Sequence, residues 1–229
     1  MRYDKILFDL DNTLIDFDEA EKNALRFNFL EFNLPYKDEY NALYHEINDK
    51  LWKKLERGEI ERLKLRTERF ESLFSAIGVS EVDSTDFNSH YLVNLGKGRK
   101  LLPNAFETVK LASLLGAKCY LITNGTTSVQ NARLSGQEFM QYISGICISE
   151  QVGVNKPDKE FFTKAEELFG VKFDNKTLVV GDSLSSDIQG GINANIDTCY
   201  INRKNLPNQS GITPTYEVDN IIKVLDLIK

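Results

Sequence analysis

Short apolar runs recur along the chain, each bounded by polar or small residues. Runs of four to seven apolar-rich residues without polar alternation are typical of strands buried on both faces of a parallel sheet. The pattern predicts such strands at residues 5–9, 118–123, 143–149, 177–182 and 198–202.

Helical periodicity fills most of the intervals between these runs. It predicts helices at residues 103–115, 126–134, 158–169 and 185–193, and a closing helix at 218–228. Strands that alternate with helices favour an α/β fold in which a doubly wound, mostly parallel sheet carries helices on both faces.

One long segment interrupts the alternation. Residues 16–98 contain no strand pattern and instead repeat apolar side chains at helical spacing, as in Tyr40, Leu43, Ile47, Leu51 and Leu55. We therefore expect a helical-bundle domain at 16–98, inserted into an α/β core domain built from residues 1–15 and 99–229. Ligands of open parallel sheets bind at the carboxyl ends of the strands, so an insert after the first strand is placed to cover the ligand.

The composition of the chain argues against several classes of function. The 229 residues include 28 basic and 34 acidic side chains, a net charge of −6, which opposes binding to a nucleic acid polymer. Three cysteines without C-x-x-C spacing indicate neither a disulfide framework nor a zinc site. A charged beginning and the lack of any long apolar window lead us to expect a cytoplasmic protein that binds no membrane. No pattern specifies an oligomeric state.

Acidic residues follow two of the predicted strands. Asp9 and Asp11 end the first strand, and Asp182 and Asp187 follow the fourth. Carboxylate oxygens at strand ends suit a hard divalent cation such as Mg²⁺. Asp is also common in turns and helix caps, which is the structural alternative for both pairs.

A hydroxyl and an ammonium group occupy equivalent positions. Thr123, Asn124 and Gly125 join the second strand to a helix, where side-chain and main-chain donors can bind an anion or simply cap the helix. Lys156 precedes another helix start; taken alone, it could be an ordinary solvated lysine.

The order of these motifs resembles the haloacid dehalogenase superfamily. The matching residues are Asp9-x-Asp11-x-Thr13, Thr123, Lys156 and Gly181-Asp182 with Asp187. The insert resembles the helical cap of the superfamily's first class. The segments around Ile122–Gly125 and 148–157 are most similar to bacterial pyrimidine 5′-nucleotidases.

This resemblance implies an Mg²⁺-dependent phosphomonoester hydrolase that forms an aspartyl-phosphate, with a nucleoside 5′-monophosphate as the substrate. Asp9 is then the nucleophile, and Asp11, initially protonated, is the general acid and base. Thr123, Asn124 and Lys156 bind the phosphoryl oxygens. The metal ligands implied are Asp9, the carbonyl of Asp11, Asp182 and, directly or through water, Asp187. The net charge of these side chains also favours a bound metal ion, because four carboxylates and one lysine would repel a dianionic phosphate unless a cation is present.

Other functions use similar residues. A sugar-phosphate phosphatase differs only in its substrate, and a phosphomutase returns the phosphoryl group to the sugar. A haloacid dehalogenase has no dianionic substrate that would require the extra acids. A phospho-accepting signalling module also pairs Asp, Mg²⁺, Thr and Lys, but needs an open site. Trp52, Tyr44 and Tyr91 could stack on a base, although aromatics at helical spacing are more often bundle core.

Overall fold

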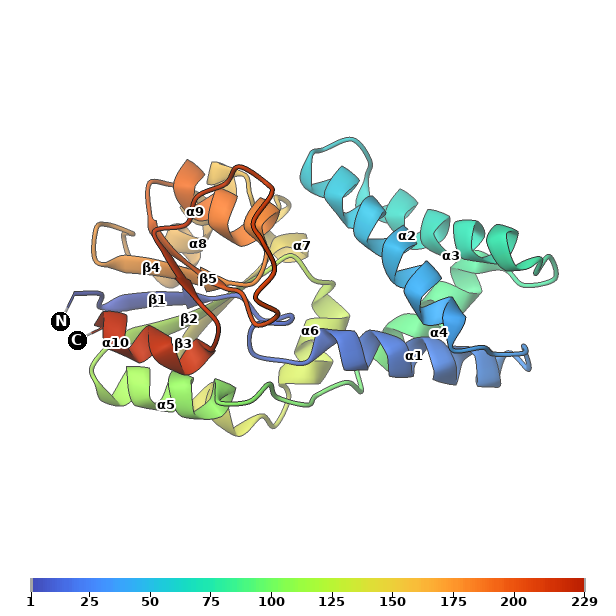
Figure 1. Cartoon of the computed structure of the whole chain (residues 1–229), viewed down its shortest axis with the longest axis horizontal. Helices are drawn as coiled ribbons and strands as arrows, with labels where there is room; N and C mark the ends of the chain where they lie inside the picture. The colour runs from blue at the N-terminus through green and yellow to red at the C-terminus, as the bar shows by residue number, and fades with distance from the viewer. Residues whose placement is uncertain (1, 229) are drawn as a thin grey trace. The chain divides into compact units, whose positions relative to one another are not determined.

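The computed structural model describes residues 2–228, which form two compact units (Figure 1). One unit consists of the residues up to Asp16 together with those from Lys100 onward, and the other is Phe17–Arg99. Each unit is described by itself. Within residues 2–228, no helix has the length and apolar character needed to span a membrane.

The first unit is built on a six-stranded sheet. Every neighbouring pair is parallel, and the strand order is β3-β2-β1-β4-β5-β6. This confirms the expected fold class. The strands are β1 Lys5–Phe8, β2 Lys118–Thr123, β3 Ile143–Ile148, β4 Thr177–Gly181, β5 Asp197–Ile201 and β6 Tyr216–Val218.

Helices cover both faces of the sheet (Figure 1). Successive strand residues point to opposite faces, so Ile6 and Phe8 of β1 join the core under α5 and α10, whereas Leu7 packs in the core with Phe161 and Phe162 of α8. The helical elements are α5 Ala105–Leu114, α6 Thr127–Leu134, η1 Glu138–Tyr142, α7 Ser149–Val152, α8 Lys159–Phe169, η2 Leu184–Ile188, α9 Gln189–Asn193, η3 Ile221–Lys223 and α10 Val224–Ile228.

The end of the chain differs from the sequence-based expectation. Residues 218–228 do not form one helix, because Val218 pairs with Ile201 as the last residue of the edge strand β6. A 3₁₀ turn and the short helix α10 follow. A three-residue, half-buried edge strand gives too short an apolar run to recognise by periodicity. Residues 184–188 are likewise a π-helical turn before α9.

The cysteines are packing residues. Cys119, Cys147 and Cys199 lie on β2, β3 and β5, and all three are buried free thiols. Burial raises the pKa of each thiol, which keeps it protonated and unreactive at neutral pH.

The second unit is helical. Its helices are α1 Phe17–Glu31, α2 Glu39–Glu56, α3 Arg62–Ile77 and α4 Ser84–Leu95, and no strand occurs among residues 17–99. Aromatic rings fill its interior: Tyr44 stacks on Phe70 with centroids 5.2 Å apart, and Tyr91 meets the same ring edge-on. Both tyrosines are fully buried, so they are bundle core. Trp52 is half-buried against Leu51 and its neighbours.

Candidate active site

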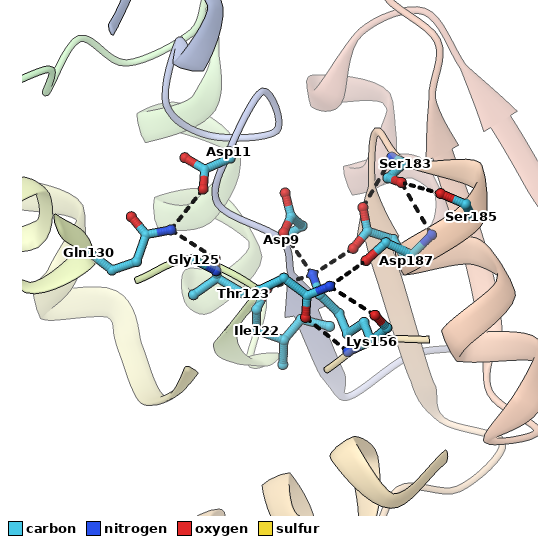
Figure 2. A network of polar contacts seen from close by, with 12 residues as sticks. Asp9, Asp11, Ile122, Thr123, Gly125, Gln130, Lys156, Ser183, Ser185 and Asp187 are labelled. Carbon is cyan, nitrogen blue, oxygen red and sulfur yellow. Dashed lines mark hydrogen bonds and ion pairs between the residues drawn. The ribbon is translucent and has the colours of Figure 1, made fainter. Parts of the chain in front are cut away.

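Three neighbouring strands bring the predicted site residues together. Asp9 follows β1, Thr123 ends β2 and Asp182 follows β4, and the order β2-β1-β4 places these ends side by side. The main-chain N–H of Asp9 continues the ladder by donating to Val180 O at 2.8 Å. Figure 2 shows Asp9, Thr123 and Lys156 at this edge.

Lys156 lies at the centre of the cluster and is 1% exposed. Its Nζ donates to Asp9 Oδ1 at 2.7 Å, to Asp187 Oδ1 at 2.6 Å and to the carbonyl of Ile122 at 3.0 Å. An ammonium group has three protons, so all are used. The geometry fixes the Asp9 carboxylate, and a contact from Lys156 to a phosphoryl group would have to share or replace one of these bonds.

The charges in the cluster perturb one another. Burial alone lowers the pKa of Lys156, but the carboxylates of Asp187 and Asp9 outweigh it, and the net pKa is raised. The net pKa of Asp9 is raised to about 7, mainly by burial, with Asp187 and Asp11 adding to the shift and Lys156 opposing it. Desolvation, with Asp9 and Asp187 nearby, likewise raises the pKa of Asp182 well above its ordinary value. The cluster therefore holds more negative charge than it can stabilise.

The donor set suits a hard divalent cation. Asp9, Asp182 and Asp187 each offer a carboxylate oxygen, and these oxygens lie within 4.8 Å of one another. Both oxygens of Asp187 accept hydrogen bonds, from Lys156 Nζ and from the N–H of Ser183 at 3.1 Å. Among residues 2–228, Asp9 Oδ2 and the Asp182 carboxylate accept none. Asp9 and Asp182 thus fit as metal ligands, whereas Asp187 holds Lys156 in place.

The crowded carboxylates predict that the stability of the protein depends on pH when a chelator removes metal ions. The pKa of Asp9 is 3.8 in the unfolded chain and about 7 in the folded protein. Its contribution to the free energy of unfolding is therefore fully present below pH 3.8 and is lost as the pH rises through about 7. We expect the free energy of unfolding to fall by roughly 2–4 kcal/mol between pH 4.5 and 8 in EDTA. Urea denaturation at both pH values, with and without Mg²⁺, measures it.

Mg²⁺ should restore the lost stability at pH 8 and have little effect at pH 4.5. Asp182→Asn removes one of the crowded charges and should flatten the pH dependence. Equal urea midpoints at pH 4.5 and pH 8 in EDTA would contradict the prediction that the crowded carboxylates destabilise the protein at high pH.

The Thr123 hydroxyl is prepared as a donor. Its Oγ1 accepts from the N–H of Gly125 at 3.1 Å and from Gln130 Nε2 at 2.8 Å. A hydroxyl has two lone pairs and one proton. With both lone pairs used, the O–H proton is left to donate to an anion, which suits a phosphoryl oxygen.

The side chain of Asn124 joins two segments of the chain that are distant in sequence. Its Nδ2 donates to the carbonyl of Lys156 at 2.8 Å and to Ser186 Oγ at 3.1 Å, while its Oδ1 accepts from the N–H of Lys156 at 2.9 Å. The amide side chain therefore fastens the Lys156 loop to β2. Any phosphate contact of Asn124 is left to its main-chain N–H.

Asp11 is bound by two residues that the sequence analysis missed. Gln130 Nε2 donates to Asp11 Oδ2 at 2.7 Å, and Arg133 Nη1 pairs with Asp11 Oδ1. An amide and a guanidinium thus hold the two oxygens of this carboxyl group. The available signal was a polar pair three residues apart on α6, on the same helix face as the buried Val129 and Leu134.

Two relatives match over essentially the whole chain. The pyrimidine 5′-nucleotidase PynA of Streptococcus pneumoniae is 37% identical, and the alignment covers 100% of this chain and 96% of the relative. The pyrimidine 5′-nucleotidase YjjG of Escherichia coli is 33% identical, with 100% and 99% covered.

A solved structure has the same fold. The HAD-hydrolase YfnB from Bacillus subtilis, in a crystal form bound to magnesium, superposes with a TM-score of 0.92 at 33% identity, covering 100% of both chains. The family model for haloacid dehalogenase-like hydrolases matches residues 3–195. Motifs, fold and relatives agree, and the chain belongs to the haloacid dehalogenase-like hydrolases.

Proposed function

We propose that this hydrolase cleaves phosphomonoesters through an aspartyl-phosphate on Asp9, in a reaction that depends on Mg²⁺. The observation that carries the proposal is the state of Asp9: Lys156 binds Oδ1 at 2.7 Å, and Oδ2 accepts no hydrogen bond within the described chain. Oδ2 is therefore left to attack phosphorus, and Oδ1 keeps a second lone pair that a metal ion would use. A carboxylate needs no base to act as a nucleophile.

The reaction has two displacements at phosphorus. In the first, Asp9 Oδ2 forms a bond to phosphorus, the bond to the leaving oxygen breaks, and Asp11 donates a proton to that oxygen. In the second, water attacks phosphorus, Asp11 accepts its proton, and phosphate leaves Asp9. Thr123 donates its O–H to a phosphoryl oxygen, and Lys156 stabilises the charge on the nucleophile.

The crowded carboxylates support the metal requirement. Mg²⁺ held by Asp9, Asp182 and the main-chain carbonyl of Asp11 would offset their charge and that of a dianionic phosphoryl group. The two histidines, His45 and His90, belong to the helical unit, where they pair with Glu21 and Glu31. We further propose that the helical unit, residues 17–99, is a cap that selects the substrate.

The relatives support the substrate class. PynA and YjjG are both named pyrimidine 5′-nucleotidases and align with this chain from end to end. We therefore propose a nucleoside 5′-monophosphate as the substrate, with a pyrimidine base favoured.

Phosphate release from a panel of esters tests this function. Pyrimidine nucleoside 5′-monophosphates should be hydrolysed with a kcat/KM at least about tenfold above sugar phosphates and glycolytic esters, a difference of about 1.4 kcal/mol in transition-state binding. EDTA should abolish release, and excess Mg²⁺ should restore it. Activity that persists in EDTA would contradict the metal requirement, and a rearranged sugar phosphate without free phosphate would instead indicate a mutase.

A further inference from the structure

Helix α6 presents two buried polar side chains to the candidate active site. Gln130 is 1% exposed and Arg133 is fully buried. They lie three residues apart, so they share one face of the helix. Gln130 and Asp11 are drawn together in Figure 2, on the opposite side of Asp9 from Asp187. Burial of a guanidinium is costly without a specific partner, and here that partner is the Asp11 carboxylate.

The side-chain amide of Gln130 is fully committed. Its Nε2 has two protons, and these go to Asp11 Oδ2 at 2.7 Å and Thr123 Oγ1 at 2.8 Å. Its Oε1 accepts from Arg133 Nη1 at 3.2 Å. The reversed amide would place an acceptor against the carboxylate, so only one orientation satisfies the network. A single amide thereby links the proposed proton donor to the proposed phosphate ligand.

Gly125 makes room for this amide. A Cβ on Gly125 would lie 2.1 Å from Gln130 Nε2, closer than atoms can approach. The small residue after Thr123 and Asn124 is therefore required by the position of Gln130, in addition to any freedom of the turn itself.

We propose that Gln130 and Arg133 are positioning residues that aim the Asp11 carboxyl group at the leaving oxygen of the substrate. Arg133 holds Oδ1 and Gln130 holds Oδ2, so both torsions of the Asp11 side chain are fixed, and each oxygen keeps a second lone-pair direction. Both residues act through the Asp11 carboxyl group. The inference rests on the proposed function, because it assigns Asp11 the proton transfer.

Proton donation matters most for a poor leaving group, and that dependence gives the test. Gln130→Met keeps the side-chain length and removes both donors. We expect its kcat/KM for an alkyl ester, a nucleoside 5′-monophosphate, to fall about 100-fold. The kcat/KM for p-nitrophenyl phosphate, whose leaving group departs without a proton, should fall less than about tenfold. The ratio of the two substrates cancels any weakening of phosphate binding through Thr123.

Arg133→Lys keeps the charge and loses the planar fork, so it should shift the ratio in the same direction by a smaller factor. Asn131→Ala, on the exposed face of the same helix, is the control and should leave the ratio unchanged. Thermal denaturation establishes that each variant is folded, and Gln130→Met carries the test if Arg133→Lys does not fold.

Two results would overturn the positioning role: equal losses on both substrates in Gln130→Met, or no loss on either. Failure of the proposed function is a separate result, because the wild-type enzyme would then release phosphate from neither ester.

Discussion

Asp9→Asn is expected to lower phosphate release by more than about 10⁴-fold while the fold remains intact. The amide can still accept a hydrogen bond from Lys156, so the local geometry is retained, but it supplies no carboxylate oxygen to attack phosphorus. The substitution also removes one charge from an overcrowded cluster, so stability in EDTA at neutral pH should rise or stay constant. Phosphate release and urea denaturation measure the two effects.

Asp219→Asn is a matched control for this experiment. Asp219 is exposed, pairs with Lys223 at 2.7 Å and lies far along the chain from the site motifs. It should keep the wild-type rate. Release at the wild-type rate by Asp9→Asn itself would show that Asp9 is not the nucleophile.

Lys156→Met is expected to destabilise the protein by about 3–5 kcal/mol and to abolish activity. Met has a similar length but no charge, so Asp9 and Asp187 would remain buried without the ammonium that binds both. The unfolding free energy should be measured in EDTA, so that a bound metal cannot replace the lost charge.

A second substitution separates charge from packing. Asp187→Asn in the Lys156→Met background removes one uncompensated carboxylate and should recover part of the lost stability, without recovering activity. Lys172→Met, at an exposed lysine paired with Glu166, is the control and should leave the urea midpoint unchanged. If the double substitution is no more stable than Lys156→Met, packing rather than charge explains the loss.

The buried strands were predictable because their signal is local. Apolar runs alone predicted strands at residues 118–123 and 177–182. Strands β2 and β4 match these ranges to within one residue. The chemistry at their ends was also visible, since Asp9, Thr123 and Asp182 follow apolar runs. Edge strand β6 was missed because a half-buried strand of three residues has no distinctive period.

The roles of individual polar side chains were less predictable. Asn124 was predicted to bind phosphate, and nothing in the sequence indicated that its side-chain amide would span from β2 to the Lys156 loop, 32 positions away. Asp11 was predicted to be the general acid and base, and its motif gave no sign that Arg133, on a helix 122 positions later in the chain, would contact it. Such pairings depend on which elements pack together, and one sequence contains no record of them.

The sequence by itself determined the order of strands and helices, the long helical insert and the set of acidic, hydroxyl and amino groups available at the strand ends. These follow from side-chain type and periodicity, which are properties of neighbours in the chain. Only the tertiary structure decided that all three protons of Lys156 are used, that Asp9 keeps one oxygen unbonded and that Gln130 joins Asp11 to Thr123. Hydrogen bonds require distance and direction, and the parallel packing of β2, β1 and β4 creates both.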